Sequence, residues 1–239
     1  FNAAAARGRV VHMILKSLLD LPKEERTLER AMDLVESRAG DLIRSQLQQG
    51  DWLNRGDEEH KTLATQWITE VVESVSKYFD IEDPRSVNVL ESERYFREDF
   101  CKDAKVPLRM LKGRMDRLDA ETISNKTVLT VVDYKTGRAP SAPRFREAAF
   151  QQLALYAVLL VRNKIYTPDV VNGKLLYLGG TPRVLSKTFD SAELQQTIRD
   201  VQQVRNDIRE SFVSPRGFVP RTSNICNFCD YRSRCPAFR

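Results

Sequence analysis

Two short segments of the chain carry carboxylates and a lysine at a spacing that suits phosphate chemistry. The segment Gly113–Asp119 (GRMDRLD) contains Asp116, and the segment DYKTG at 133–137 contains Asp133 and Lys135. Side chains two residues apart on a strand point to the same side, so Asp133 and Lys135 share one face, where Asp116 from a neighbouring strand can meet them. Paired carboxylates bind hard divalent cations such as Mg²⁺ or Mn²⁺. A lysine beside them can orient a hydroxide or stabilise a pentacovalent phosphate.

The same aspartate and lysine could instead form an ordinary ion pair at the end of a strand. The residues before them, from Thr127 to Val132, are mostly apolar and β-branched, which is typical of a buried central strand. A charged pair at the end of such a strand lies at the sheet edge where α/β proteins gather functional residues. This position favours a functional role for Asp133 and Lys135.

The elements that must position these residues follow from hydrophobic periodicity and from turn residues. Residues 1–83 are predicted to be helical, and the first helix ends before Leu21-Pro22. The remainder alternates between strands and helices, which predicts an α/β protein with a mixed central sheet flanked by helices. The predicted helices lie at about 10–19, 24–49, 58–79, 145–163 and 191–212, and the strands at 87–97, 107–119, 127–134, 173–179 and 183–189, with an irregular tail after Pro215.

Together with three further motifs, the two acidic segments resemble the nuclease domain of RecB-type exonucleases in the PD-(D/E)XK superfamily. RGRVVH at 7–12 resembles the family's R-G-x-x-x-H motif, and QLALY at 152–156 resembles its Q-x-x-x-Y motif. A C-terminal cysteine cluster resembles the iron–sulfur branch, which includes the AddB nuclease domain and the CRISPR-associated exonucleases. The resemblance implies one nuclease domain over 1–239 with a restriction-endonuclease-like core. Its parts would be a helical part at 1–83, a catalytic α/β core at 84–212 and a cluster-binding tail at 213–239.

The resemblance also implies a role for each residue of the acidic site. His12, Asp116 and Asp133 would bind Mg²⁺ or Mn²⁺. The main-chain carbonyl of Tyr134 would add a fourth ligand, and Lys135 would be the catalytic lysine. Without the resemblance, His12 would be interpreted as a packed histidine on a mostly apolar helix face.

The helix after the second acidic segment contributes two more residues to the implied site. Gln152 and Tyr156 are four residues apart and therefore share one helix face. By resemblance this face approaches the DNA and the active site, although the two residues alone would fit an ordinary amphipathic helix. Glu91 or Glu93, on the preceding strand, could supply another carboxylate, and the sequence does not choose between them.

Three of the four cysteines, Cys226, Cys229 and Cys235, form a C-x₂-C-x₅-C arrangement near the end of the chain. Thiolates at such spacing converge on one metal centre in a reducing compartment, although free thiols are the ordinary alternative. The resemblance implies an iron–sulfur cluster of the 4Fe-4S type, with zinc as the alternative. The family's fourth cysteine lies upstream of the first motif, so we expect it to precede this chain, which begins without Met. Cys101 and, for zinc, His60 are alternatives.

Composition permits this function without establishing it. The chain has 239 residues, enough for a sizeable core, and 38 Lys and Arg residues against 33 Asp and Glu residues give a net charge of +5. Such a charge allows a nucleic-acid partner. No apolar run approaches the ~20 residues that span a bilayer, so no membrane partner is expected.

We therefore predict a metal-dependent DNA exonuclease that acts on single-stranded DNA or DNA ends in repair or recombination. The cysteine usage predicts an intracellular, cytoplasmic location, and a helicase on another chain is an expected partner. The alternative function is a non-catalytic DNA-binding subunit of a helicase–nuclease complex.

Overall fold

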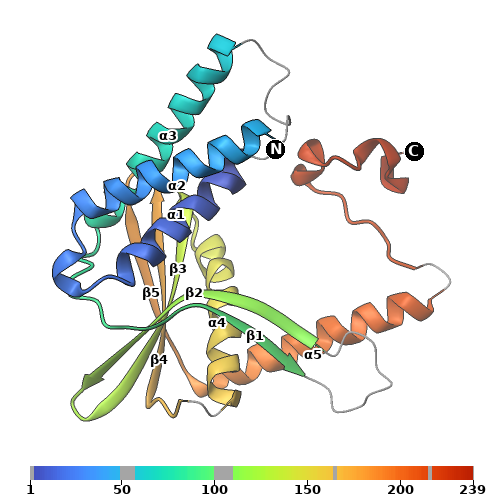
Figure 1. Ribbon diagram of the computed structural model, residues 1–239. Helices are drawn as coiled ribbons and strands as arrows, with labels where there is room; N and C mark the ends of the chain where they lie inside the picture. Colours follow the sequence, from blue (N-terminus) through green and yellow to red (C-terminus); the bar gives the residue numbers. More distant parts are fainter. Residues whose placement is uncertain (1–2, 49–56, 100–109, 164–165, 215–216, 239) are drawn as a thin grey trace.

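A computed structural model describes residues 3–48, 57–99, 110–163, 166–214 and 217–238, in three layers (Figure 1). Three helices cover one face of a central sheet and a fourth covers the other face, with a fifth packed beside the fourth. The helices are α1 (Ala3–Leu19), α2 (Leu28–Gln48) and α3 (Asp57–Phe79) on the first face, then α4 (Pro143–Asn163) and α5 (Ser191–Val213). No helix in the described ranges is both long and apolar enough to cross a bilayer.

The sheet has five strands in the order β1-β2-β3-β4-β5, and only β3 and β4 run parallel. Helix α4 makes the crossover connection that a parallel pair requires. The predicted fold class, a mixed α/β sheet flanked by helices, is therefore confirmed. The strands are β1 (Val89–Asp99), β2 (Met110–Ile123), β3 (Lys126–Arg138), β4 (Val170–Gly179) and β5 (Arg183–Phe189).

The observed boundaries differ from the predicted ones where local side chains decide them. The second helix begins at Leu28 rather than near 24, because Lys23–Glu25 form a 3₁₀ turn and the Thr27 hydroxyl then accepts the Arg30 N–H at 3.2 Å. Strands β2 and β3 are longer than predicted. They meet in a tight turn at Ser124-Asn125, where both residues have positive φ. The tail forms three short 3₁₀ turns, at Asn224–Phe228, Arg232–Arg234 and Pro236–Phe238.

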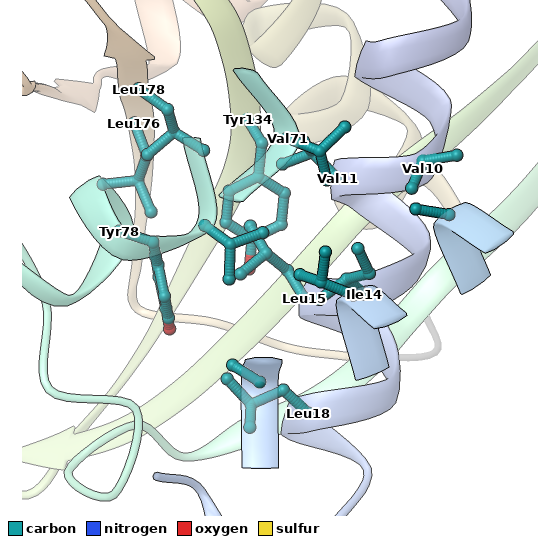
Figure 2. Close-up of a cluster of buried hydrophobic side chains, with 14 of the residues drawn as sticks. Val10, Val11, Ile14, Leu15, Leu18, Val71, Tyr78, Tyr134, Leu176 and Leu178 are labelled. Carbon is teal, nitrogen blue, oxygen red and sulfur yellow. The ribbon is translucent and has the colours of Figure 1, made fainter. Parts of the chain in front are cut away.

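Two apolar cores hold the layers together, one on each face of the sheet. In the first core, the periodic residues of α1 pack against α3 and against Tyr134, Leu176 and Leu178 of the sheet (Figure 2). In the second core, α4 packs on the opposite face through residues such as Leu153 and Leu160. Because both faces are covered, the central strands are apolar along most of their length.

A buried charged network joins the first core to the sheet. Arg117 on β2 is 1% exposed, and its guanidinium donates to both carboxylate oxygens of Glu82, at 2.7 and 3.0 Å. It also donates to Asp119 at 2.9 Å and to the Tyr134 hydroxyl at 2.8 Å. Lys174 on β4 completes the network at 2.5 Å from Glu82. Glu82 follows α3, so the network ties the helical layer to three strands.

The electrostatics of this network favour an ionised Glu82. Burial alone would raise the pKa of Glu82, but hydrogen bonds and charges from Arg117 and Lys174 outweigh it and lower the pKa to about 2. The bidentate geometry supplies the hydrogen bonds that a buried pair needs to offset desolvation. Removing Glu82 would leave two cations, Arg117 and Lys174, with Asp119 as the one remaining carboxylate of the network.

We predict that Glu82→Gln destabilises the fold strongly. The substitution leaves the buried Arg117 guanidinium without its bidentate partner, and breaking a buried pair in this way costs about 3–5 kcal/mol. Urea denaturation at neutral pH, followed by circular dichroism, measures the loss. Glu121→Gln, at an exposed position on the same sheet, is the control and should change the free energy of unfolding by less than about 0.5 kcal/mol.

The stabilisation from Glu82 should also depend on pH. Its folded pKa of about 2 lies below the ordinary value of 4.5, so the unfolded chain binds the proton more tightly. The contribution is complete above about pH 4.5 and is lost as the pH falls toward about 2. The difference in unfolding free energy between wild type and Glu82→Gln should therefore narrow across this window. A difference that stays constant there would contradict the assigned pairing.

Candidate active site

The candidate site lies where strands β2 and β3 separate. Their pairing ends at Arg117 opposite Val132, and the part of β2 before Arg117 pairs with β1 alone. At this fork the side chain of Asp116 replaces the missing ladder bond, because its Oδ2 accepts the N–H of Tyr134 at 3.0 Å. The fork therefore places a carboxylate against the end of a buried strand.

Helix α1 brings His12 to the same fork. Its Nε2 lies 2.9 Å from the Tyr134 carbonyl oxygen, and its Nδ1 lies 3.3 Å from Asp116 Oδ1. The imidazole edge also packs on the Tyr134 ring, with the two ring centroids 5.7 Å apart. Because α1 is anchored through its buried residues, His12 is positioned by the core and lies beside two of its three predicted partners.

Strand β1 adds a third candidate ligand, and the geometry distinguishes the two glutamates that the sequence left open. Ligand atoms of His12, Glu93 and Asp116 all lie within 4.8 Å of one another, which no other set of three such residues achieves within the described ranges. Glu91 instead contacts Arg94 and the Tyr166 hydroxyl. Glu93 has a φ of 54°, a strained conformation for a residue with a side chain, of the kind that clusters at functional sites.

Asp133 and Lys135 share one face of β3, as their spacing predicts. Asp133 Oδ2 lies 2.7 Å from Lys135 Nζ. The two groups form an ion pair, but the angles at the contact are not those of a hydrogen bond. Burial raises the pKa of Asp133, and the negative charge of Asp116 adds to this effect. Asp133 is thus close enough to Asp116 to feel its charge. However, it lies outside the three-residue group that contains His12 and Glu93.

Helix α4 links the lysine to β2 through a short chain of hydrogen bonds. Lys135 Nζ donates to Gln152 Oε1 at 3.3 Å, and Gln152 Nε2 donates to the Tyr156 hydroxyl at 3.3 Å. The hydroxyl in turn donates to the Arg114 carbonyl at 2.6 Å. The Tyr156 ring is buried and stacks on Phe96, with the ring centroids 6.0 Å apart. The two helix residues therefore hold the ammonium group of Lys135 in place.

The donor set fits a hard divalent cation. Burial alone would lower the pKa of His12, but the hydrogen bond and charge of Asp116, with the charge of Asp133 and the Tyr134 carbonyl, raise it. A group of acceptors that attracts a proton to this ring also attracts a metal ion, which needs the neutral imidazole. Two carboxylates and one imidazole nitrogen within 4.8 Å of one another form a ligand set that such an ion takes.

Comparison with known protein families identifies the superfamily of the chain. The family model for the PD-(D/E)XK nuclease superfamily matches residues 1–236. The chain belongs to the PD-(D/E)XK nuclease superfamily. Nucleases of this superfamily hydrolyse phosphodiester bonds and typically use divalent metals, which suits the ligand group at the fork.

Two solved structures resemble this chain at low sequence identity. SSO0001, known from a crystal structure, has 17% sequence identity to this chain and a TM-score of 0.38. The match covers 77% of this chain and 79% of SSO0001. An inferred exonuclease from Eubacterium rectale is 12% identical, with a TM-score of 0.42 and coverage of 82% and 78%. No curated protein sequence matches the chain significantly.

The cysteine cluster predicted for the nuclease tail is not assembled in the described residues. Cys226, Cys229 and Cys235 lie on or next to the short 3₁₀ turns, and their sulfur atoms are not all within 4.8 Å of one another. The Ser223 N–H donates to the Cys226 sulfur at 3.4 Å. Cys101 lies outside the described residues, as does the side chain of His60. The metal-binding role of these residues stays a prediction.

We predict that Gly113→Ala impairs the nuclease by displacing Tyr156. A Cβ atom at position 113 would lie 2.8 Å from Tyr156 Cε1 and 3.3 Å from its hydroxyl oxygen. The ring must shift and lose its bonds to Arg114 and Gln152, which loosens the lysine. Misplacement by about 1 Å can cost about 100-fold in rate, so we expect a fall in kcat of between about 10-fold and 100-fold.

Gly137→Ala is the matched control, since a Cβ at that position would meet nothing within 4 Å. Single-turnover cleavage rates of the two variants make the comparison. Equal rates for both variants would show that the position of Tyr156 does not matter for cleavage.

Proposed function

We propose that this protein is a Mg²⁺- or Mn²⁺-dependent DNA exonuclease of the RecB type, acting on single-stranded DNA or DNA ends in repair or recombination. The supporting observation is the convergence of His12, Glu93 and Asp116 at the fork, next to the paired Asp133 and Lys135. This arrangement joins a cation site to a positively charged group, which hydrolysis of a phosphodiester needs.

In this proposal, His12, Asp116 and Asp133 would hold the ion with the Tyr134 carbonyl, and Glu93 would add a further carboxylate. When bound, the ion supplies an activated water and neutralises the scissile phosphate. Glu93, which the sequence left open against Glu91, joins these ligands because its carboxylate lies beside His12 and Asp116.

Lys135 acts on the water and on the phosphate. Its ammonium group is held between Asp133 and Gln152 and is one-third exposed, so it can reach a substrate. From this position it orients the attacking water and stabilises the charge that develops on the phosphate oxygens. Asp133, buried beneath it, keeps the ammonium group fixed, and Tyr156 fixes the amide of Gln152.

The cysteine tail completes the proposal. We propose that Cys226, Cys229 and Cys235 bind a structural 4Fe-4S cluster, with zinc as the alternative, which implies an intracellular, reducing environment. The iron and zinc content of the purified protein distinguishes the two. A helicase on another chain would supply unwinding.

We predict that Asp116→Ala abolishes cleavage and that Lys135→Ala lowers kcat by about 100-fold to 1000-fold, the usual cost of losing one group that stabilises developing charge. Release of nucleotides from end-labelled single-stranded DNA with Mn²⁺ is the measurement. Glu121→Ala and Lys126→Ala remove the same charges at exposed positions on the same two strands, so they should retain wild-type rates.

Cleavage that survives both site substitutions would rule out this active site. DNA binding without cleavage by the intact protein, in either metal, would favour a non-catalytic subunit of a helicase–nuclease complex.

We also predict that Glu93→Gln weakens Mn²⁺ binding at least about 10-fold, because an amide replaces a charged ligand. The matched control is Glu91→Gln, two residues earlier on β1, since Glu91 contacts Arg94 rather than the site. Titration followed by electron paramagnetic resonance reports free Mn²⁺ directly. Equal affinities for the two variants would exclude Glu93 as a ligand.

A further inference from the structure

Beyond the fork, β1 and β2 continue as a two-stranded ribbon with two different faces (Figure 1). One face is packed: Phe96 and Met115 are buried in the second core, and Gly113 lies against Tyr156 of α4. Arg94 stabilises this side because its guanidinium lies over the rings of Phe96 and Tyr166, at 5.2 and 6.0 Å from their centroids. The ribbon is therefore held firmly against the body of the protein.

The opposite face is exposed and basic. Its side chains form two cross-strand pairs, Tyr95 opposite Arg114 and Arg97 opposite Lys112. Tyr95 is 59% exposed, the Arg114 side chain is 64% exposed, and Arg97 and Lys112 are exposed as well. We call these four residues the ribbon track. It presents three positive charges and one phenol ring to solvent.

The ribbon track begins at the candidate active site. Along the chain, Glu93 precedes Tyr95 on β1, and Asp116 lies two residues after Arg114 on β2, so strand alternation puts Asp116 on this face. Arg114 Nε also contacts Glu93 Oε2 at 2.8 Å, so the first basic residue of the track touches a candidate metal ligand. Successive pairs are about 6.7 Å apart along the strands. That step is close to one nucleotide of an extended single strand.

We propose that the ribbon track binds a single strand of nucleic acid as it enters or leaves the active site. Arg114 and the next pair along the ribbon, Arg97 with Lys112, would contact phosphates of neighbouring nucleotides, and Tyr95 would stack on an unpaired base. A duplex gives the exposed ring no accessible base face, so the phenol favours a single strand. The inference rests on the proposed nuclease function and assigns it a substrate-binding surface.

The first test removes the two charges farthest from the fork. Arg97→Ala/Lys112→Ala is compared with Lys126→Ala/Arg183→Ala, which lowers the net charge equally at exposed positions elsewhere on the sheet. Fluorescence anisotropy measures the Kd for a labelled oligothymidylate in EDTA, where no cleavage occurs, at several salt concentrations. We expect the slope of log K against log salt to become shallower by about 1.4 in the track variant only, about 0.7 for each lost contact.

The second test addresses the phenol ring. Tyr95→Ala should raise the Kd for the single strand by between about 5-fold and 100-fold, while Tyr95→Phe should retain affinity because it keeps the ring face. The same variants are measured with a blunt duplex of equal length. An equal change in the salt slope for the track variant and for the control variant would show that the ribbon track does not bind the strand. An unchanged Kd for Tyr95→Ala, or an equal loss with duplex, would overturn its assignment to a single strand.

Failure of the track and failure of the nuclease proposal give different results. If the track is wrong but the nuclease is right, wild type cleaves with Mn²⁺ while the track variants bind like the control. If the track is right but the nuclease is wrong, the binding differences appear in EDTA although no variant cleaves.

Discussion

The candidate site depends on the hydrogen bonds made by the buried guanidinium of Arg117. Arg117 hydrogen bonds to the hydroxyl of Tyr134 and pairs with Glu82, so it fixes the point where β3 passes beneath the helical layer. The main chain of that same tyrosine carries both backbone contacts of the site. Its N–H binds Asp116 and its carbonyl oxygen lies against His12. The core network and the ligand group therefore share one residue, and loosening the first would displace the second.

The separation of β2 from β3 determines which side chains can reach Tyr134. If the two strands had stayed paired, the main chain of β2 would have accepted the Tyr134 N–H in place of the Asp116 carboxylate. Because they part, side chains from α1, β1, β2 and α4 converge on the end of a buried strand. The separated part of β2, paired with β1, also leaves an exposed basic face next to the ligands.

The sequence predicted the sheet, its flanking helices and the set of motif residues, since these depend on periodicity and on spacing along single elements. It predicted that Gln152 and Tyr156 share a face, and in the structure Gln152 accepts from Lys135 and donates to Tyr156. It did not choose Glu93 over Glu91, because both positions alternate identically on β1 and the distinction comes from a positive φ. Arg117 was also overlooked, because nothing along the strand shows that Glu82 and Lys174 meet it.

The charges at the fork explain how three carboxylates can occupy one site in the folded chain. Asp133 is paired with Lys135 and Glu93 with Arg114, while Asp116 lies against a ring nitrogen of His12, which is a cation only when protonated. These pairs offset the repulsion that burial would otherwise intensify. The three partner side chains differ in exposure, and Arg114 is more exposed than Lys135 and His12. Because solvent screens the exposed guanidinium of Arg114, this contact stabilises Glu93 less than the Lys135 contact stabilises the buried Asp133.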